Sequence, residues 1–239
     1  MIAIIDYDAG NVKSVQKALA YLHEDTILTR DPKQLLAAEK VILPGVGAFG
    51  DAMGKLKEYG LIDVISEIVD KNTPFLGICL GMQLAIIEFA RNILNIKDAN
   101  SMEFDPNTKE PLIYLIDSFI DANGKKQIRT YKSPLGGTMR LGGYDCNIRP
   151  DTLLSKIYGT KKTRERHRHR YEANPKYREI LEKNGLIVSG ESDGLIEAIE
   201  LKNHPFFIGV QFHPEFTSRL ISPNPVILNF IEASIKNGR

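Results

Sequence analysis

Tryptophan is missing from this 239-residue sequence and cysteine is scarce, with only Cys79 and Cys146. Two cysteines cannot build the disulfide framework that stabilises many small secreted domains, so a reducing cytoplasm is the simplest compartment for them. Apolar runs are also short, and none approaches the roughly 18 residues that a membrane-spanning helix needs. The apolar start, Met1–Asp6, lacks the basic region of a signal peptide. These absences predict a cytoplasmic protein that does not act on a membrane.

An excess of charge of either sign is absent as well. The sequence carries 31 basic and 30 acidic side chains, a net charge of +1, so no overall field recruits nucleic acid or an anionic membrane. Hydrophobic residues make up 43% and charged residues 26%, as in ordinary globular proteins. This composition excludes a disordered chain, a collagen and a coiled coil, and the length allows a hydrophobic core without disulfides or metals.

One segment has a biased composition: Lys161–Arg170 carries six basic residues, one acid and the interleaved His167 and His169. No nucleic-acid-binding module accompanies it, so nucleic acid is not an expected partner. The two histidines lack further ligands at metal-binding spacing, so no metal site is expected. We interpret the segment as a basic edge of the fold that lies near the functional site.

Strand and helix signals alternate through the first 90 residues. Short apolar runs closed by turn residues predict strands at Ile2–Ile5, Thr26–Thr29, Val41–Leu43 and Phe75–Ile78. Apolar residues at helical spacing follow each of them, and Asp31-Pro32 has the capping pattern of a helix start. Strands that are apolar throughout and alternate with helices indicate a parallel sheet covered on both faces.

The pattern changes after about Asn92, where glycine, proline, asparagine and aspartate become more frequent. A turn is predicted at Asn123-Gly124, and Cys146 falls among turn-forming residues. Further strands are predicted at Leu186–Ser189, Leu195–Glu200 and Phe206–Phe212, and a closing helix at Pro225–Ile235. The sequence therefore predicts one α/β domain over residues 1–239 with an elaborated second half.

The first chemical motif is Gly77–Gly81 (GICLG), at the junction of an apolar strand and a helix. A nucleophile on such a tight turn is lifted out of the sheet, and flanking glycines make room for the strained backbone. The helix N-terminus behind Cys79 favours the thiolate and leaves the Leu80 N–H group free to bind an oxyanion. A buried structural cysteine between two packing glycines is the alternative.

Two further motifs match this elbow. His213 and Glu215, two residues apart on an extended segment, project to the same side, so Glu215 can orient the imidazole toward a thiol. The alternative for this pair is an ordinary surface contact. Pro44–Gly50 (PGVGAFG) follows another strand and can offer N–H groups at the same sheet edge. No Gly-Lys-Ser/Thr follows it, so a nucleotide-binding P-loop is not expected.

Together, the elbow, the His-Pro-Glu segment and the upstream Pro-Gly loop resemble the class I (triad) glutamine amidotransferases over essentially the whole chain. The resemblance implies a three-layer α/β sandwich with a mostly parallel central sheet and a flavodoxin-like core. It also implies that a Cys79, His213 and Glu215 triad hydrolyses the side-chain amide of glutamine, with oxyanion donors at Leu80 and at Val46 or Gly47. No cofactor is expected.

The two parts of the chain resemble different members of this family. Residues 1–73 resemble the glutaminase subunit of imidazole glycerol phosphate synthase, an enzyme of histidine biosynthesis, through Ile4–Asn11 (IIDYDAGN) and Leu43–Met53 (LPGVGAFGDAM). Residues 74–239 resemble the amidotransferase domain of CTP synthase, an enzyme of pyrimidine biosynthesis. The segments that carry this second resemblance are Pro74–Gln83, Asp98–Asp105, Gly137–Gly142, Glu165–Glu172 and Gln211–Phe216. A chimera joined near the nucleophile strand is our hypothesis.

The resemblance also assigns the binding of L-glutamine. It implies that Gln83 faces the pocket, that Glu103 binds the substrate α-ammonium group, and that the backbone at Arg170 and Tyr171 binds the substrate's α-carboxylate and amine. A synthase domain or subunit of a CTP synthase-like or an imidazole glycerol phosphate synthase-like system would receive the ammonia. Three alternatives stay open: a γ-glutamyl hydrolase or cysteine peptidase, a catalytically silent chimeric scaffold, and an enzyme active only when docked on its synthase.

Overall fold

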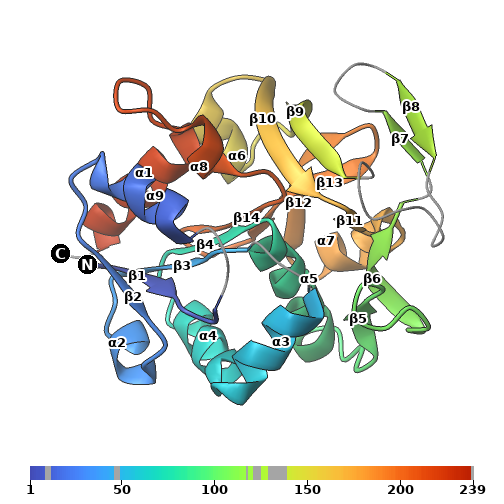
Figure 1. Ribbon diagram of the computed structural model, residues 1–239, viewed down its shortest axis with the longest axis horizontal. Coiled ribbons are helices and arrows are strands. Elements are labelled where there is room, and N and C mark those ends of the chain that lie inside the picture. Colours follow the sequence, from blue (N-terminus) through green and yellow to red (C-terminus); the bar gives the residue numbers. More distant parts are fainter. Residues whose placement is uncertain (9–11, 46–48, 117, 121–124, 129–138, 238–239) are drawn as a thin grey trace.

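The computed structural model describes residues 1–8, 12–45, 49–116, 118–120, 125–128 and 139–237. Within these residues nine strands form one central sheet in the order β10-β9-β12-β13-β14-β4-β3-β1-β2 (Figure 1). The strands are β1 (Ile2–Ile5), β2 (Thr26–Thr29), β3 (Lys40–Leu43), β4 (Phe75–Ile78), β9 (Arg140–Ile148), β10 (Lys162–His169), β12 (Leu186–Ser192), β13 (Leu195–Leu201) and β14 (Phe207–Val210).

The parallel half of the sheet contains β14, β4, β3, β1 and β2. All residues of β1, β3, β4 and β14 are buried, which explains why these strands are continuously apolar rather than alternating, apart from Lys40 at the start of β3. The predicted strands at residues 2–5, 26–29 and 75–78 have the bounds that the structure gives them. The expected α/β fold with a large central sheet is confirmed, and the sheet is mixed because its other half is antiparallel.

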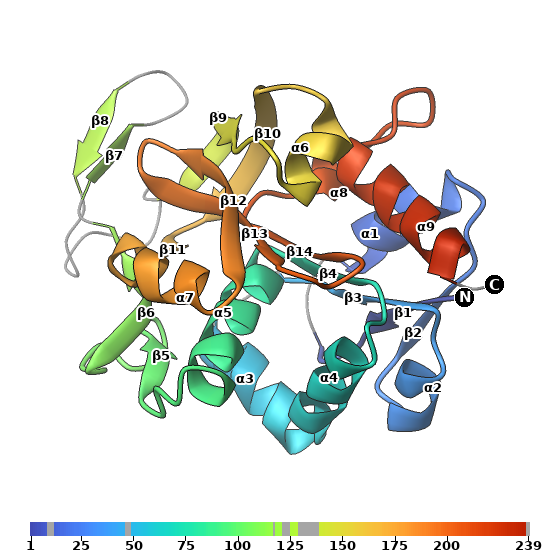
Figure 2. The same cartoon turned by 180° about the vertical axis from the view of Figure 1, so that it is seen from behind.

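Helices cover both faces of the sheet, as expected (Figures 1 and 2). One core cluster unites the sheet with α2, α3, α4, α5 and α7, and a second unites it with α1, α6 and α9. The bounds are α1 Val12–Ala20, α2 Pro32–Leu36, α3 Phe49–Glu58, α4 Leu61–Asp70, α5 Leu80–Asn92, α6 Leu153–Tyr158, α7 Arg178–Lys183, α8 Pro214–Thr217 and α9 Pro225–Asn237. Asp31 caps α2 by accepting a hydrogen bond from the Lys33 N–H group, as its sequence predicts.

The biased segment 161–170 forms β10, which pairs with β9 and ends the sheet order. The lysine and arginines of β10 are exposed, whereas Glu165, His167 and His169 alternate with the arginines and are buried. The expected basic edge segment is therefore an edge strand. The placement of Cys146 among turn residues is wrong, because it lies fully buried in β9.

Smaller sheets extend the second half of the chain. One contains β11 (Tyr171–Ala173), β6 (Glu110–Leu115) and β5 (Ala99–Ser101), and the other pairs β7 (Ser118–Ile120) with β8 (Lys126–Ile128). The turn predicted at residues 123–124 lies outside the described residues. None of the helices in the described ranges combines the length and hydropathy that crossing a bilayer requires.

Candidate active site

Cys79 lies on a strained turn between β4 and α5. Its backbone has φ 52° and ψ −104°, a conformation that residues with a side chain rarely adopt. The Cys79 N–H group donates to the Val210 carbonyl at 2.6 Å, which ties the turn to the neighbouring strand β14. The predicted elbow is present, and α5 begins at Leu80, immediately after the cysteine.

Close backbone contacts hold this turn in place. A Cβ atom on Gly81 would lie 2.3 Å from the Leu43 carbonyl oxygen, so only glycine allows the start of α5 to pack against the end of β3. A Cβ atom on Gly45 would lie 2.5 Å from the Leu80 nitrogen. The start of the Pro44–Gly50 loop therefore lies directly against the predicted oxyanion donor, Leu80.

The other predicted oxyanion donors, Val46 and Gly47, lie outside the described residues. Sequence reasoning did not single out the residue that anchors the start of their loop. The buried Tyr7 hydroxyl donates a hydrogen bond to the Pro44 carbonyl. Burial, together with the charge of Cys79, raises the pKa of Tyr7, so this hydroxyl stays protonated and remains a donor.

His213 and Glu215 form the predicted pair. Nδ1 of His213 lies 2.8 Å from Oε1 of Glu215, and the ring of Phe216 stacks on the imidazole at a centroid distance of 4.5 Å. Pro214 occupies the first turn of α8, and the His213 N–H group donates to the Arg166 carbonyl at 2.8 Å. These contacts fix the imidazole on both its ring face and its Nδ1 edge.

The charge of the His213 ring depends on Cys79 as well as on Glu215. Burial alone would lower the pKa of His213, but interactions with Cys79 and Glu215 outweigh it and raise the pKa to about 10. Among the described residues, Nε2 of His213 is buried and makes no hydrogen bond. An imidazolium beside a thiolate, with Nε2 available for proton transfer, is what nucleophilic catalysis by a cysteine requires.

The predicted substrate residues lie around one corner of the fold. The buried Gln83 side chain donates from Nε2 to the Tyr171 carbonyl at 2.9 Å, and Arg170 links β10 to β11. Glu103 follows β5 on the same three-stranded sheet as Tyr171, and its N–H group donates to Ser101 Oγ. The structure thus brings Gln83 and Tyr171 into contact, and it places Glu103 beside the same small sheet.

A buried ionic cluster near this corner was missed by sequence reasoning. Nη1 of Arg140 lies 2.7 Å from Glu197 Oε1 and 3.1 Å from Glu172 Oε1, and all three side chains are buried. Nδ1 of His167 lies 2.8 Å from Nε2 of His169 beside it. The buried histidines alternate with exposed arginines along β10, and this period of two was the available signal. Within the described residues, no group of three or more possible ligands is arranged to hold a metal.

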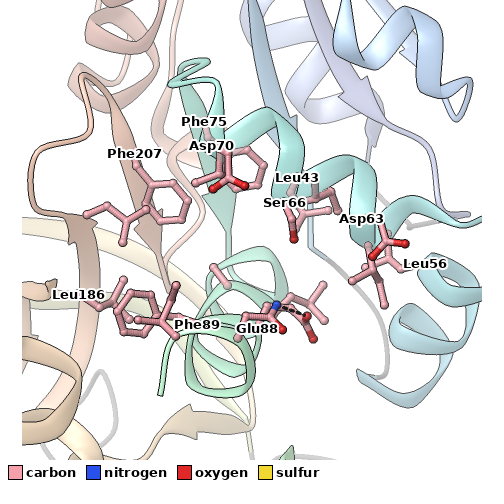
Figure 3. Close-up of a pocket in the computed structure, with 18 of the residues that line it drawn as sticks. Leu43, Leu56, Asp63, Ser66, Asp70, Phe75, Glu88, Phe89, Leu186 and Phe207 are labelled. Atoms are coloured by element: carbon pink, nitrogen blue, oxygen red, sulfur yellow. Dashed lines mark hydrogen bonds between the residues drawn. The ribbon is translucent and has the colours of Figure 1, made fainter. Parts of the chain in front are cut away.

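A separate cavity of about 450 Å³ lies between α3, α4 and α5 and the sheet (Figure 3). Phe75, Leu186, Phe207 and other apolar side chains line it, and Asp63 and Asp70 of α4 stand at its wall. The candidate triad is not among its lining residues, so this space is distinct from the site at Cys79.

Comparisons with known proteins are consistent with this geometry. The sequence profile of the family "Glutamine amidotransferase class-I" matches residues 3–233. A CTP synthase of Wolinella succinogenes is 60% identical over 229 residues, which cover 95% of this chain and 40% of that protein. A CTP synthase of Campylobacter jejuni subsp. doylei is 65% identical over 177 residues, or 74% of this chain and 33% of that protein. The chain thus spans about 40% or less of the length of these curated relatives.

Solved structures include a similar fold. The structure described as "Trypanosoma brucei CTPS - glutaminase domain with bound acivicin" superposes with a TM-score of 0.76 at 29% identity, covering 98% of this chain and 93% of that one. A putative GMP synthase component from Thermoplasma acidophilum has a TM-score of 0.63 at 18% identity, covering 99% of this chain and 94% of that one. The second match concerns the fold alone.

Proposed function

The chain belongs to the class I glutamine amidotransferase family, and from that premise we propose that it hydrolyses the side-chain amide of L-glutamine to glutamate and ammonia. The observation that carries the proposal is the juxtaposition of a strained cysteine elbow with a buried His–Glu pair that Cys79 itself helps to charge. No metal or cofactor enters the proposed reaction.

In the proposed mechanism the Cys79 thiolate attacks the amide carbon of glutamine. The oxyanion that forms accepts hydrogen bonds from the Leu80 N–H group at the start of α5 and from Val46 or Gly47. His213 gives a proton to the departing ammonia and then takes one from the water that cleaves the thioester. Glu215 holds His213 in the required orientation through the 2.8 Å contact at Nδ1.

Glutamine is held, on this proposal, by Gln83, Glu103 and the backbone at Arg170 and Tyr171. An amino-acid zwitterion needs one anionic contact for its ammonium group and donors for its carboxylate. The shared small sheet that carries Glu103 and Tyr171, and the direct contact between Tyr171 and Gln83, support this assignment.

The ammonia acceptor is, on this proposal, a CTP synthase-like domain or subunit of pyrimidine biosynthesis. Support comes from the relatives named CTP synthase, whose sequences extend well beyond the length of this chain. The two free cysteines support the cytoplasm as its compartment. Glutamine-dependent CTP formation after addition of a synthase lacking its own glutaminase would test the acceptor.

The origin of residues 1–73 is a separate part of the proposal. The match to the CTP synthase of Wolinella succinogenes covers 95% of the chain at 60% identity, so it extends into residues 1–73 and gives no support to a separate origin for them. The proposed chimera, whose first part would derive from a histidine-biosynthesis glutaminase, therefore rests on the motifs at Ile4–Asn11 and Leu43–Met53 alone. Pairing of β3 with β4 across the junction supports a single domain over residues 1–239. An uninterrupted natural gene encoding this sequence would contradict an engineered fusion.

The test of the glutaminase function is glutamate release from glutamine by the purified chain. We expect turnover that disappears in Cys79→Ala and persists in Cys146→Ala, because Cys146 is buried in β9 away from the elbow. Equal glutamate release by the Cys79→Ala variant would contradict the proposal. Hydrolysis of γ-glutamyl peptides, measured in parallel, tests the alternative of a γ-glutamyl hydrolase or cysteine peptidase. A folded protein that hydrolyses neither glutamine nor these peptides would favour the catalytically silent scaffold.

A further inference from the structure

Gln211 lies beside the nucleophile because two parallel strands end together. β14 and β4 pair in parallel with Val210 opposite Ile78, so the next residues along each chain, Gln211 and Cys79, are also neighbours. The Gln211 side chain is fully buried, and its Nε2 atom donates to Sγ of Cys79 at 3.5 Å. This residue is not among those assigned above to the reaction.

The neighbours of Gln211 fix the direction of its amide. The Tyr171 carbonyl can only accept, so the atom of Gln83 that lies 2.9 Å from it must be the Nε2 donor. The same Nε2 atom lies 3.0 Å from Gln211, where it must meet the Oε1 acceptor. The NH₂ group of Gln211 is thereby left facing Cys79, and a flipped amide would oppose two donors.

We infer that Gln211 is a positioning residue that holds Sγ of Cys79 and stabilises the thiolate by donating a hydrogen bond to it. A donor aimed at an anion favours its charged form, and buried hydrogen bonds to charged groups are the stronger ones. The inference rests on the proposed function only in taking Cys79 as the nucleophile. It connects the thiolate to the predicted glutamine site through Gln83 and Tyr171.

Two titratable groups also act on Cys79 and belong in the design of a test. His213 from the start of α8 supplies positive charge, and the buried Tyr7 hydroxyl after β1 stays protonated. The N-terminus of α5 adds a partial positive charge. Substitutions at Gln211 leave all three in place, so a change in thiolate reactivity can be assigned to the lost donor.

The experiment measures the rate of Cys79 alkylation by iodoacetamide against pH, with peptide mapping to separate it from Cys146. Gln211→Leu removes the donor, and Gln211→Glu replaces it with an acceptor of the same shape. Ser189→Ala is the matched control, because Ser189 on β12 is buried and its hydroxyl has no hydrogen-bond partner among the described residues. Thermal unfolding of each variant reports whether it is folded.

We expect the pH midpoint of alkylation to rise by roughly one unit in Gln211→Leu and by more in Gln211→Glu. At a fixed pH below the midpoint, a shift of that size lowers the fraction of thiolate, and with it the alkylation rate, by about tenfold or more. Ser189→Ala should keep the wild-type midpoint. A midpoint unchanged in both folded Gln211 variants would overturn the inference.

If both Gln211 variants unfold, Gln83→Leu provides a second test, because it removes the hydrogen bond that holds the Gln211 amide. This variant must also raise the midpoint, and an unchanged midpoint would overturn the inference. Alkylation needs no glutamine turnover, so the inference can fail while the proposed glutaminase function holds. Equally, the glutaminase function can fail while the role of Gln211 holds.

Discussion

Replacing Gly45 by alanine should impair catalysis strongly while leaving the protein folded. The added Cβ atom would lie 2.3 Å from the Ile78 carbonyl oxygen, 2.5 Å from the Leu80 nitrogen and 2.6 Å from the Gly81 nitrogen. These are backbone atoms of the elbow and cannot rotate away. The segment that carries Gly45 must therefore retreat from the predicted oxyanion donor at Leu80.

The size of the effect follows from that displacement. Restoring a contact of at least 3.0 Å needs a shift on the order of 0.7–1 Å, and a misplacement of that size costs about 100-fold in rate. Complete loss of one oxyanion donor would bring the fall in kcat to about 10²–10³-fold. The local strain should lower the free energy of unfolding by about 1–3 kcal/mol.

The assay is steady-state glutamate release, with urea unfolding measured on the same preparations. Gly54→Ala is the matched control, since a Cβ atom there, on the exposed face of α3, meets nothing within 4 Å. It should leave kcat unchanged and stabilise the fold by about 0.5–1 kcal/mol. Wild-type kcat in a folded Gly45→Ala variant would refute the assignment of this loop to the oxyanion site.

Three further changes probe the surroundings of the elbow. Arg140→Leu removes the guanidinium from Glu172 and Glu197 and leaves these buried carboxylates only their histidine neighbours, so it should lower the free energy of unfolding by about 3–5 kcal/mol. A loss below about 1 kcal/mol in urea would contradict a structural role for the cluster. Tyr7→Phe removes the hydrogen bond to the Pro44 carbonyl at the start of the oxyanion loop and should lower the free energy of unfolding by about 1–3 kcal/mol. We also expect a lower kcat, because this hydrogen bond anchors the loop. Burial lowers the pKa of His213, but Cys79 and Glu215 raise it to about 10 in the folded protein, against about 6.5 in the unfolded chain. The protonated imidazole therefore stabilises the fold fully below about pH 6.5, and this contribution is lost as pH rises through about 10. The free energy of unfolding should thus fall toward about pH 10, and equal pH profiles in wild type and His213→Gln would speak against this interaction.

Local patterns were sufficient to predict the parallel half of the fold. Strands β1 and β4 are short apolar runs closed by turn residues, and their burial on both faces favours that composition. The elbow could be predicted because the end of β4, Cys79 and the start of α5 follow one another in the chain, although the contact that demands glycine at position 81 comes from Leu43 on β3. Helix α5 begins at Leu80, directly after Cys79, as the motif predicts.

Pairing between distant segments could not be predicted in the same way. β9 contains two glycines, an aspartate and an asparagine, so Cys146 is surrounded by turn-forming residues, and only its neighbours β10 and β12 make the segment a strand. The contact of Gln211 with Cys79 depends on the register of β14 against β4. Neither residue carries a local signal of the other, so such contacts emerge only in the folded protein.

The most direct test of the account is the mass of the intact protein quenched in acid during turnover of glutamine. The account predicts a γ-glutamyl adduct, located by peptide mapping on the peptide that contains Cys79, that is absent from Cys79→Ala and from His213→Gln, which lacks the proton donor for the departing ammonia. Glutamate release without an adduct on Cys79, or an adduct that persists in Cys79→Ala, would contradict the claim that this elbow and its His–Glu pair form the catalytic centre.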